Sequence, residues 1–326
     1  MNPAATLDAV AAALLEAERV VVCAHVGPDG DAIGSVLGLT LALRDAGIDA
    51  TPTLANDRTP PVTYSFLPGF DLWRPVSQLD APDTFVALDT PVASRLGIAE
   101  PLMRAASRVI VLDHHPDQPL YGDTTFTDAS MAATGQIVWR LLPALGAAPS
   151  TQIARCLYVA LMTDTGRFTY DNTTPAALRD AAEMLDAGAD PAEAARHVYQ
   201  ERSARSLALE ALTLERLTRA NGGRIVWSHL TDADFEATGA LPEEAEHLPD
   251  AIRSLGGIDV AVFFRVKGDE IRVNLRAKTG FDVGAVGREL GGGGHRAAAG
   301  LTWKGSELEP LLARLLPLLP GGDTRR

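Results

Sequence analysis

The sequence predicts an α/β protein with two domains, the first of which is built on a parallel sheet flanked by helices. Its 326 residues, 46% of them hydrophobic, are enough for two separate cores. In the first half, apolar runs rich in β-branched residues alternate with helical periodicity, which is typical of a parallel sheet. Beyond the stop signal Asn221-Gly222-Gly223, a smaller set of strand and helix patterns follows. We therefore expect a first domain at 1–200, a helical connector at 201–222 and a smaller C-terminal α/β domain at 223–320.

Each element of the first domain follows from its hydrophobic pattern. Continuous apolar runs predict buried parallel strands. The expected strands are Arg19 to Ala24, Ala50 to Leu54, Thr84 to Asp89 and Ser107 to Asp113. Apolar residues at spacings of three and four predict helices. The expected helices are Ala4 to Ala17, Asp31 to Ala46, Met131 to Leu142, Gln152 to Met162, Pro175 to Ala187 and Pro191 to Tyr199.

The rest of the chain is predicted in the same way. Ser203 to Ala220 interleaves Leu with Arg and Glu, so we expect one amphipathic connecting helix that ends at the Asn-Gly-Gly signal. Lys267-Gly268-Asp269 predicts a tight turn between two antiparallel strands. The expected strands are Arg224 to His229, Ile258 to Val266 and Glu270 to Ala277, and the expected helices are Asp282 to Leu290 and Glu307 to Leu319.

Charge and cysteine content narrow the classes of function. The net charge of −13 argues against a protein that grips long nucleic acids. Residues 253–304 nevertheless carry nine Lys or Arg against five Asp or Glu, a local balance of +4 that suits a small anionic ligand. Cys23 and Cys156 fall in predicted core elements, which favours buried apolar residues over a disulfide or a thiolate metal site. No apolar stretch reaches the ~18 residues of a membrane span, so we expect a soluble, cytoplasmic protein.

Aspartate and histidine follow apolar runs at four points of the predicted first domain. The triplet Asp113-His114-His115 ends the run Arg108 to Leu112. The other three points are His25-Val-Gly-Pro-Asp29-Gly-Asp31, Asp89 and Asp164. Each of them alone is an ordinary turn or helix cap. Because the carboxyl ends of parallel strands meet at one edge of a sheet, together they supply enough ligands for two neighbouring metal ions.

The ligand types also indicate which metals would bind. A carboxylate between two metals ~3.5–4 Å apart is the usual scaffold of two-metal hydrolysis, and Asp89 is our candidate for that bridge. Mixed imidazole and carboxylate ligands favour Mn²⁺ over Ca²⁺ and are softer than Mg²⁺ usually prefers, although Co²⁺, Fe²⁺ or Zn²⁺ also fit. Adjacent residues at a strand end point in opposite directions, so we expect only His114 of the two histidines to join the metal cluster.

Several segments are candidates for binding the substrate. Four consecutive glycines let backbone N–H groups approach an anion, and the following His295 and Arg296 add donors, although a glycine run alone is equally typical of a hinge. Arg265 and Arg276 are candidates that project from strands toward the same place, with an ordinary solvated strand residue as the plain alternative for each. Phe168 offers a stacking surface, with core packing as the plain alternative, and Thr134 opens a helix whose N-terminal amides suit phosphate. The glycines concerned are Gly292, Gly293 and Gly294.

On these motifs, nearly the whole chain resembles the DHH phosphoesterase family, and Gly291-Gly-Gly-Gly294-His295 resembles the glycine run of the DHH-associated domain. The resemblance implies one metal held by His25, Asp29 and Asp89. It implies a second metal held by Asp31, Asp89, His114 and Asp164. Asp113 would support the ligand shell and His115 would face the phosphate, which places Asp89, Asp113, His114 and His115 at the catalytic centre. The second domain would bind nucleotide phosphate and base.

The resemblance further implies a manganese-dependent enzyme with two Mn²⁺ ions that acts on small nucleotides and short single-stranded oligonucleotides. It points to the standalone branch that contains nanoRNases with phosphatase activity on 3′-phosphoadenosine 5′-phosphate (pAp) and cyclic-dinucleotide phosphodiesterases. Water is expected to be the nucleophile. A cyclic di-AMP phosphodiesterase, a RecJ-like single-strand exonuclease and a nucleotide sensor without catalysis remain as alternatives. The lysine and arginine cluster of manganese pyrophosphatases is missing. The sequence leaves the oligomeric state open, a homodimer included.

Overall fold

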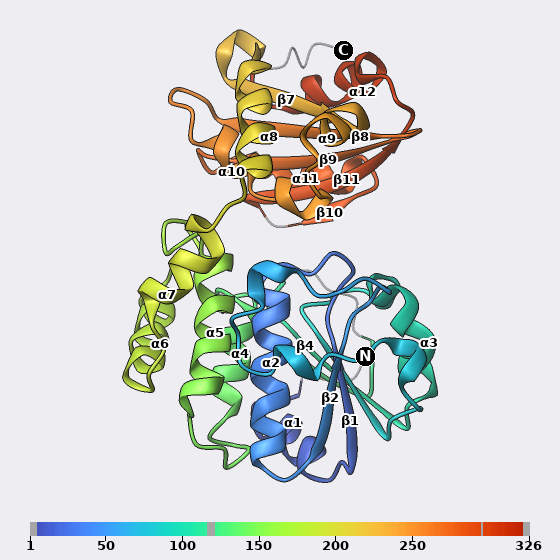
Figure 1. Ribbon diagram of the computed structural model, residues 1–326, viewed down its shortest axis with the longest axis vertical. Helices are drawn as coiled ribbons and strands as arrows, with labels where there is room; N and C mark the ends of the chain where they lie inside the picture. Colours follow the sequence, from blue (N-terminus) through green and yellow to red (C-terminus); the bar gives the residue numbers. More distant parts are fainter. Residues whose placement is uncertain (1–4, 116–120, 295, 322–326) are drawn as a thin grey trace. The chain divides into compact units, whose positions relative to one another are not determined.

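The chain divides at Glu201 into two units, which the computed structural model describes over residues 5–115, 121–294 and 296–321 (Figure 1). Unit 1 covers Met1–Glu201 and unit 2 covers Arg202–Arg326. Each unit has its own sheet and its own buried hydrophobic clusters. The predicted α/β class is therefore confirmed.

Unit 1 is built on a five-stranded parallel sheet with the order β2-β1-β3-β4-β5. Its strands are β1 Arg19–Cys23, β2 Asp49–Thr53, β3 Thr84–Leu88, β4 Arg108–Asp113 and β5 Thr124–Thr127. The sequence predicted the first four but missed β5, because Thr-Thr-Phe-Thr is not a continuous apolar run. In this order β2 lies on one side of β1, and the later strands β3, β4 and β5 lie on the other side. The switch point lies between β1 and β3, where open α/β sheets bind their ligands.

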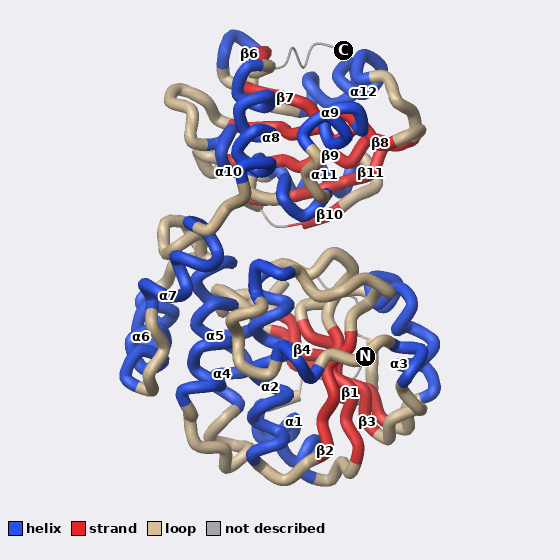
Figure 2. The backbone as a smooth tube through the Cα atoms, viewed as in Figure 1, coloured by secondary structure: helices blue, strands red, loops and turns tan. Residues whose placement is uncertain are grey.

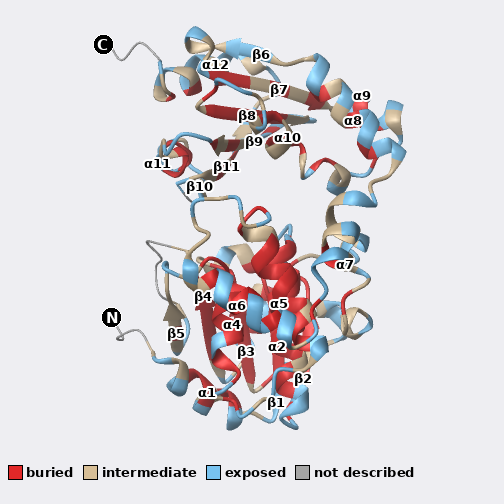
Figure 3. Cartoon of the chain, turned by 90° about the vertical axis from the view of Figure 1, so that its left-hand side faces the viewer, coloured by how far each residue is buried: buried red, intermediate tan, exposed pale blue. Residues whose placement is uncertain are grey.

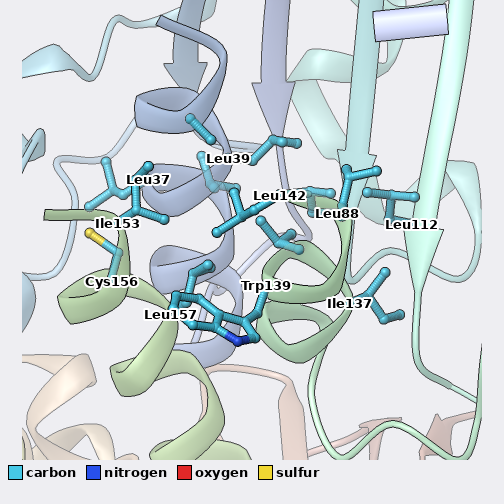
Figure 4. Close-up of a cluster of buried hydrophobic side chains, with 14 of the residues drawn as sticks. Leu37, Leu39, Leu88, Leu112, Ile137, Trp139, Leu142, Ile153, Cys156 and Leu157 are labelled. Carbon is cyan, nitrogen blue, oxygen red and sulfur yellow. The ribbon is translucent and has the colours of Figure 1, made fainter. Parts of the chain in front are cut away.

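Helices cover both faces of this sheet (Figure 2). They are α1 Leu7–Leu15, α2 Gly30–Asp45, α3 Glu100–Ala105, α4 Thr134–Leu141, α5 Thr151–Asp164, α6 Pro175–Asp186 and α7 Pro191–Ala195. The larger core joins α2, α4 and α5 to one face of the sheet, and a smaller core joins α3 to the other. In the larger core, Leu37, Trp139 and Leu157 of the helices pack with Leu88 and Leu112 of the strands (Figure 4).

A stripe of glycines lets α2 and α5 pack closely. Gly30, Gly34 and Gly38 lie four residues apart on α2, and a Cβ atom at Gly34 would come within 2.4 Å of the Cys156 carbonyl oxygen of α5. A Cβ atom at Gly30 would meet the Thr163 side chain at 2.5 Å. The start of α2 therefore lies against the end of α5. Figure 3 shows α5 and the central strands as buried elements.

The last helical segment of unit 1 differs from its prediction. One helix was expected over Pro191 to Tyr199, but α7 ends at Ala195 and a π-helical turn, Arg196–Gln200, follows. The rings of Phe66 and His197 stack with their centroids 4.4 Å apart, which packs this wider turn against the segment that contains Phe66. Short 3₁₀ turns also occur in unit 1, at Val62–Tyr64, Phe70–Leu72, Val76–Gln78 and Ala93–Ala99.

Unit 2 contains a six-stranded mixed sheet with the order β10-β11-β9-β8-β7-β6. Its strands are β6 Thr218–Ala220, β7 Ile225–Thr231, β8 Val260–Lys267, β9 Glu270–Ala277, β10 Gly293–Gly294 and β11 Ala298–Lys304. The predicted hairpin is confirmed, because β8 and β9 pair antiparallel with Lys267 opposite Glu270. Strands β10 and β11 were missed; Gly-Gly and the first three residues of β11, Ala-Ala-Gly, have low strand propensity and are strands here through pairing.

Helices also lie on both faces of the sheet of unit 2. They are α8 Ala204–Glu215, α9 Asp232–Thr238, α10 Leu248–Arg253, α11 Val283–Glu289 and α12 Leu308–Leu315. One cluster joins residues of α8, α9 and α10 to one face, and a second joins α11 and α12 to the other. The prediction of one helix over Ser203 to Ala220 is wrong at its end. Helix α8 stops at Glu215, and Thr218–Ala220 pairs with β7, so that Asn221-Gly-Gly forms the turn of a hairpin.

Among the described residues, no helix has the length and apolar character that crossing a bilayer requires.

Candidate metal centre

Four segments of unit 1 deliver carboxylates and imidazoles to the carboxyl edge of its sheet. His25 and Asp29 lie in the loop after β1, and Asp31 lies in the first turn of α2, which Asp29 caps. Asp89 follows β3, and Asp164 ends α5. Strands β1, β3 and β4 are neighbours in the sheet, so their ends meet there. The remaining residues are those of the triplet at the end of β4, Asp113, His114 and His115.

Asp89 lies at the centre of this group. Its backbone has φ = +53°, a left-handed conformation that Asp tolerates and that often marks a functional site. Its Oδ2 lies 3.2 Å from His25 Nε2, while its Oδ1 lies 3.5 Å from His114 Nε2 and 3.4 Å from His115 Nδ1. The residue is 3% exposed. The two carboxylate oxygens of Asp89 therefore face different imidazoles: one oxygen faces His25, and the other faces His114 and His115.

The candidate ligand atoms form three overlapping groups, and within each group they all lie within 4.8 Å of one another. The groups are His25 with Asp29 and Asp89, Asp31 with His114 and Asp164, and Asp89 with His114 and His115. The first group is the set expected for one metal, and the second contains all but the bridging residue of the set expected for the other. Folding thus brings together the six residues that were expected as ligands.

Two histidines have the orientation that metal ligands usually have. His25 Nδ1 lies 3.0 Å from the Val26 carbonyl oxygen, and His114 Nδ1 lies 3.3 Å from the Met131 carbonyl oxygen. A proton on Nδ1 donated to a carbonyl leaves Nε2 as the nitrogen directed at the carboxylates. Neutral Nε2 atoms together with carboxylate oxygens are a donor set that suits divalent transition metals. The residues present therefore fit a divalent metal centre.

His115 has a different orientation. Its backbone N–H donates to Asp113 Oδ1 at 2.7 Å, and its Nδ1 lies 2.7 Å from the same oxygen. The expectation that the two histidines point in opposite directions is wrong, because both reach Asp89 and their ring centroids are only 4.9 Å apart. Strand β4 ends at Asp113, so the alternation of a strand no longer governs residues 114 and 115.

Burial and crowding shift the protonation equilibria of the centre. Burial, together with the charge of Asp89, raises the pKa of Asp31 well above its usual range. Burial also opposes ionisation of Asp89, but the hydrogen bond from His25 and the charges of the other imidazoles hold its pKa well below the usual range. Burial lowers the pKa values of the three histidines, and the surrounding carboxylates more than offset this, so that all three are raised. The centre therefore attracts positive charge.

The helix terminus that was expected to bind phosphate is occupied by a carboxylate. Thr134 N donates to Asp31 Oδ2 at 2.7 Å, and Gly135 N donates to Asp31 Oδ1 at 2.9 Å. Helix α4 has no side-chain cap of its own at Ala133, so Asp31 satisfies its first amides. The Thr134 hydroxyl also donates to Asp89 at 3.1 Å. Thr134 thus contacts two predicted metal ligands, and its amide is not available for phosphate.

Phe168 and two arginines also differ from the simplest expectation. The Phe168 ring is half-buried against the core of unit 1, with its centroid 6.0 Å from that of Tyr158. In unit 2, Arg265 lies over the Phe235 ring at 4.5 Å, whereas Arg276 Nε lies 3.5 Å from Asp250 Oδ1. The two arginines share a face of the β8–β9 hairpin, but they are four positions apart along it, or ~13 Å. They do not project to one point.

The glycine run forms strand β10 and the turn before it. A Cβ atom at Gly292 would come within 2.2 Å of the Gly300 carbonyl oxygen, and Gly294 has φ = +131°. Gly293 has no neighbour within 4 Å of such an atom. Close pairing with β11 therefore explains Gly292 and Gly294, while Gly293 remains open. The Arg296 guanidinium donates to the Gly280 carbonyl at 2.7 and 2.9 Å. His295 lies outside the described residues.

Three polar residues near the predicted ligands were not predicted from the sequence, and two of them contact a ligand directly. Ser35 Oγ donates to Asp31 at 2.9 Å, and its position four residues after Asp31 on a helix could have indicated this. Asn172 Nδ2 donates to the backbone carbonyl of Asp164 at 3.1 Å and lies 3.4 Å from its carboxylate. Gln136 donates to the buried Asp180 at 2.6 Å. For Gln136 the sequence contains no signal, because its contact depends on the packing of α4 against α6, whereas Asn172 contacts Asp164 from the loop that follows α5.

Two family models match this chain. The model described as "DHH family, N-terminal domain" matches residues 19–161, and the DHHA1 domain model matches residues 233–318. The first match spans the loop after β1, the triplet and most of α5, and the second spans β8, β9 and the glycine run.

Similar proteins cover nearly the whole chain. A Thermus thermophilus protein named bifunctional oligoribonuclease and PAP phosphatase NrnA is 37% identical over 298 residues, which are 91% of this chain and 88% of that protein. A Bacillus subtilis protein of the same name is 27% identical over 303 residues, 91% and 94% of the two chains. The crystal structure of an exopolyphosphatase-related protein from Bacteroides fragilis superposes with a TM-score of 0.84 at 25% identity, covering 94% of this chain and 93% of that one.

Proposed function

This chain belongs to the DHH family of phosphoesterases, and on that premise we propose that it hydrolyses short oligonucleotides and pAp to mononucleotides. Relatives named for both activities match it over most of its length and theirs. The observation that carries the proposal is the group of carboxylates and imidazoles around Asp89. A phosphate ester presents negative charge, and a centre that gathers divalent cations can bind and polarise such a group.

We propose that the residues of this centre divide into two kinds. His25, Asp29 and Asp89 would hold one cation, and Asp31, Asp89, His114 and Asp164 the other. Divalent cations bound there would lower the pKa of water and neutralise the charge that develops on the phosphoryl group. The geometry supports Asp89 as the shared ligand, because its two oxygens face different imidazoles.

The second kind of residue is His115, which we propose contacts the phosphate. Its Nδ1 is engaged by Asp113, which is fully buried. Burial lowers the pKa of His115, but the hydrogen bond that its ring donates to Asp113 and the charges of Asp89 and Asp113 together more than offset this, and the raised pKa favours an imidazolium that donates from Nε2. Asp113 would act by holding this ring in place. Such a donor stabilises charge on a phosphoryl oxygen without taking part in metal binding.

We propose that unit 2 supplies recognition of the anionic nucleotide. Its segment 253–304 carries the excess of +4. Arg276 is 20% exposed on the strand face that also bears Asn274 and Arg272. A Cβ atom at Gly293 would meet nothing within 4 Å, and this glycine lies three residues before Arg296. His295, Arg265 and Phe168 remain candidates from the sequence. We further propose Mn²⁺ as the physiological metal and the cytoplasm as the site of action.

A substrate panel with purified protein and Mn²⁺ tests this function. We expect fast release of mononucleotides from two- to five-residue oligonucleotides and from pAp, and slow release from long single strands. Comparable kcat/KM on a long strand would favour an exonuclease of the RecJ type. Preference for cyclic di-AMP would move the protein to the cyclic-dinucleotide branch. If calorimetry shows metal binding but no phosphoester is hydrolysed with Mn²⁺, Co²⁺ or Mg²⁺, the result would favour a nucleotide sensor without catalysis.

A further inference from the structure

A chain of buried polar groups runs from helix α6 to the loop in front of α4. Gln136 and Asp180 are both fully buried. Gln136 Nε2 donates to Asp180 Oδ2 at 2.6 Å, and Arg140 Nε donates to the same oxygen at 2.9 Å. Arg140 also forms an ion pair with Asp180 Oδ1. None of these residues belongs to the groups that could hold a metal, yet burying such a carboxylate is costly unless every contact is made.

The other end of the Gln136 side chain holds the backbone of this loop. Its Oε1 accepts a hydrogen bond from Ala132 N at 2.7 Å. An amide can bind in either of two orientations, and the flipped one would place its NH₂ against the Ala132 N–H and its oxygen against the Asp180 carboxylate. The carboxylate therefore selects the orientation in which Gln136 accepts from Ala132.

Residues 131–135, the segment that Gln136 holds, contact three predicted metal ligands directly and are linked to a fourth, Asp164, through Asn172. The Met131 carbonyl lies 3.3 Å from His114 Nδ1. The amides of Thr134 and Gly135 donate to Asp31, and the Thr134 hydroxyl donates to Asp89. The Ala132 carbonyl accepts from Asn172 Nδ2, which also donates to the backbone carbonyl of Asp164. A shift of this segment would therefore move His114, Asp31, Asp89 and Asp164 together.

We propose that Asp180 is a positioning residue for the metal centre, acting through Gln136 and the segment 131–135. This inference rests on the proposed metal-dependent function. Arg140 neutralises the buried carboxylate, while Asp180 fixes the Gln136 amide and hence the backbone that orients the ligands. Partners that orient metal ligands typically contribute ten- to a hundredfold to metal affinity or activity.

The test is Mn²⁺ binding by calorimetry to Asp180→Ala in the full chain, at a temperature well below its unfolding midpoint. We expect affinity to fall about ten- to a hundredfold. The Mn²⁺ concentration for half-maximal activity should rise by the same factor, while KM for pAp at saturating Mn²⁺ stays within twofold. Arg140 is 43% exposed and stays hydrated without its partner, so the variant should fold. Gln136→Met, close in shape but without the amide, should show the same loss.

Glu183→Gln is the matched control. Trp139 Nε1 donates to Glu183 Oε2 at 3.0 Å, so this pair joins the same two helices one turn away and does not contact the segment 131–135. We expect its Mn²⁺ affinity within twofold of the parent. Equal losses in Glu183→Gln and Asp180→Ala would overturn the proposal, as would unchanged affinity in Asp180→Ala. Should Asp180→Ala not fold, unchanged affinity in Gln136→Met overturns it. If the parent protein binds Mn²⁺ but cleaves no substrate, the proposed function is wrong. The Mn²⁺ affinity of Asp180→Ala, measured by calorimetry, would still test the positioning role of Asp180.

Discussion

The sheet edge of unit 1 and the Arg216–Asp234 pair of unit 2 neutralise buried carboxylates in different ways. At the sheet edge of unit 1, the ion pairs found for Asp31, Asp89 and Asp113 are with imidazoles. In unit 2, Asp234 accepts two hydrogen bonds from the Arg216 guanidinium, each 2.7 Å long. Arginine keeps its charge at every physiological pH, whereas an imidazole can give up its proton. A cation can therefore replace protons in unit 1, while the pair in unit 2 is permanent.

The pKa shifts express the same difference. The Arg216 hydrogen bond, aided by Thr231, holds the pKa of Asp234 well below its usual value. Burial raises the pKa of Asp31, where neighbouring carboxylates add to the effect. A carboxylate that folding has made more acidic stabilises the fold, while one made less acidic stores unfavourable charge. The Arg216–Asp234 pair of unit 2 therefore contributes to stability, whereas Asp31 of unit 1 holds a charge that a bound cation would stabilise.

The largest effect is expected for Asp89→Asn. The loss of one negative charge and of the shared ligand should abolish high-affinity binding of the second Mn²⁺ ion and lower kcat more than roughly 1,000-fold, because a metal contributes several kcal/mol to the transition state. Asp83→Asn is the control: Asp83 lies directly before β3, at the opposite edge of the sheet, where it accepts hydrogen bonds from the amides of Glu18 and Arg19. It should lose stability but keep both metals. Two Mn²⁺ ions per chain in Asp89→Asn would contradict the bridge.

Next in size is Asp234→Ala in unit 2. It removes both hydrogen bonds of Arg216 and the capping box with Thr231, which should lower the free energy of unfolding of this unit by roughly 2–4 kcal/mol. In the parent, this contribution is constant above pH ~4, the ordinary pKa of aspartate, and is lost as pH falls toward the depressed folded value. Denaturant unfolding of the parent and the variant at pH 7 and pH 3 measures both the size of this contribution and its dependence on pH. Mn²⁺ binding should not change, and a loss there would contradict the separation of roles.

A pH series sharpens the comparison further. Since the pKa values of His25, His114 and His115 are raised, these residues carry protons near neutral pH that a metal must displace from the ligating imidazoles. Mn²⁺ affinity should therefore rise between pH 6 and pH 8 by up to about tenfold per unit for each proton released. Calorimetry in buffers of different ionisation enthalpy counts those protons. Affinity independent of pH would show that the imidazoles are already neutral.

The smallest effect is expected for Arg276→Ala, which tests substrate binding by unit 2. We expect KM for short oligonucleotides to rise roughly tenfold with Mn²⁺ affinity unchanged, the size of one charge-assisted contact. Arg253→Ala is the matched control, because Arg253 Nη1 lies 3.7 Å from the same Asp250 oxygen but projects from α10. Equal changes in both variants would mean that the effect comes from releasing Asp250. An unchanged KM in Arg276→Ala would show that this arginine does not contribute to substrate binding.

The sequence was sufficient to predict an element where one hydrophobic pattern coincided with one strand or helix. Val-Val-Val in β1 and Val-Ile-Val-Leu in β4 can only be buried on both faces, and the ligand segments follow such runs directly. It was insufficient where pairing creates the element. Leu217 continues the periodicity of α8, but the three residues after it pair with β7 instead. Strand β10 consists of two glycines and β11 begins with Ala-Ala-Gly, and these small residues are strands through pairing with their partners.

For the metal centre, the sequence by itself determined which side chains are present and that they follow the ends of strands and helices. The order of the strands and the packing of α2 against α5 through Gly34 decided that these side chains meet. Only the tertiary structure assigned the amides of α4 to Asp31 and brought Asp180 to Gln136. The physical reason is the distance along the chain over which each kind of interaction acts. Strand and helix propensities act over a few adjacent residues, whereas hydrogen bonds between separate helices form only after the core has placed their backbones.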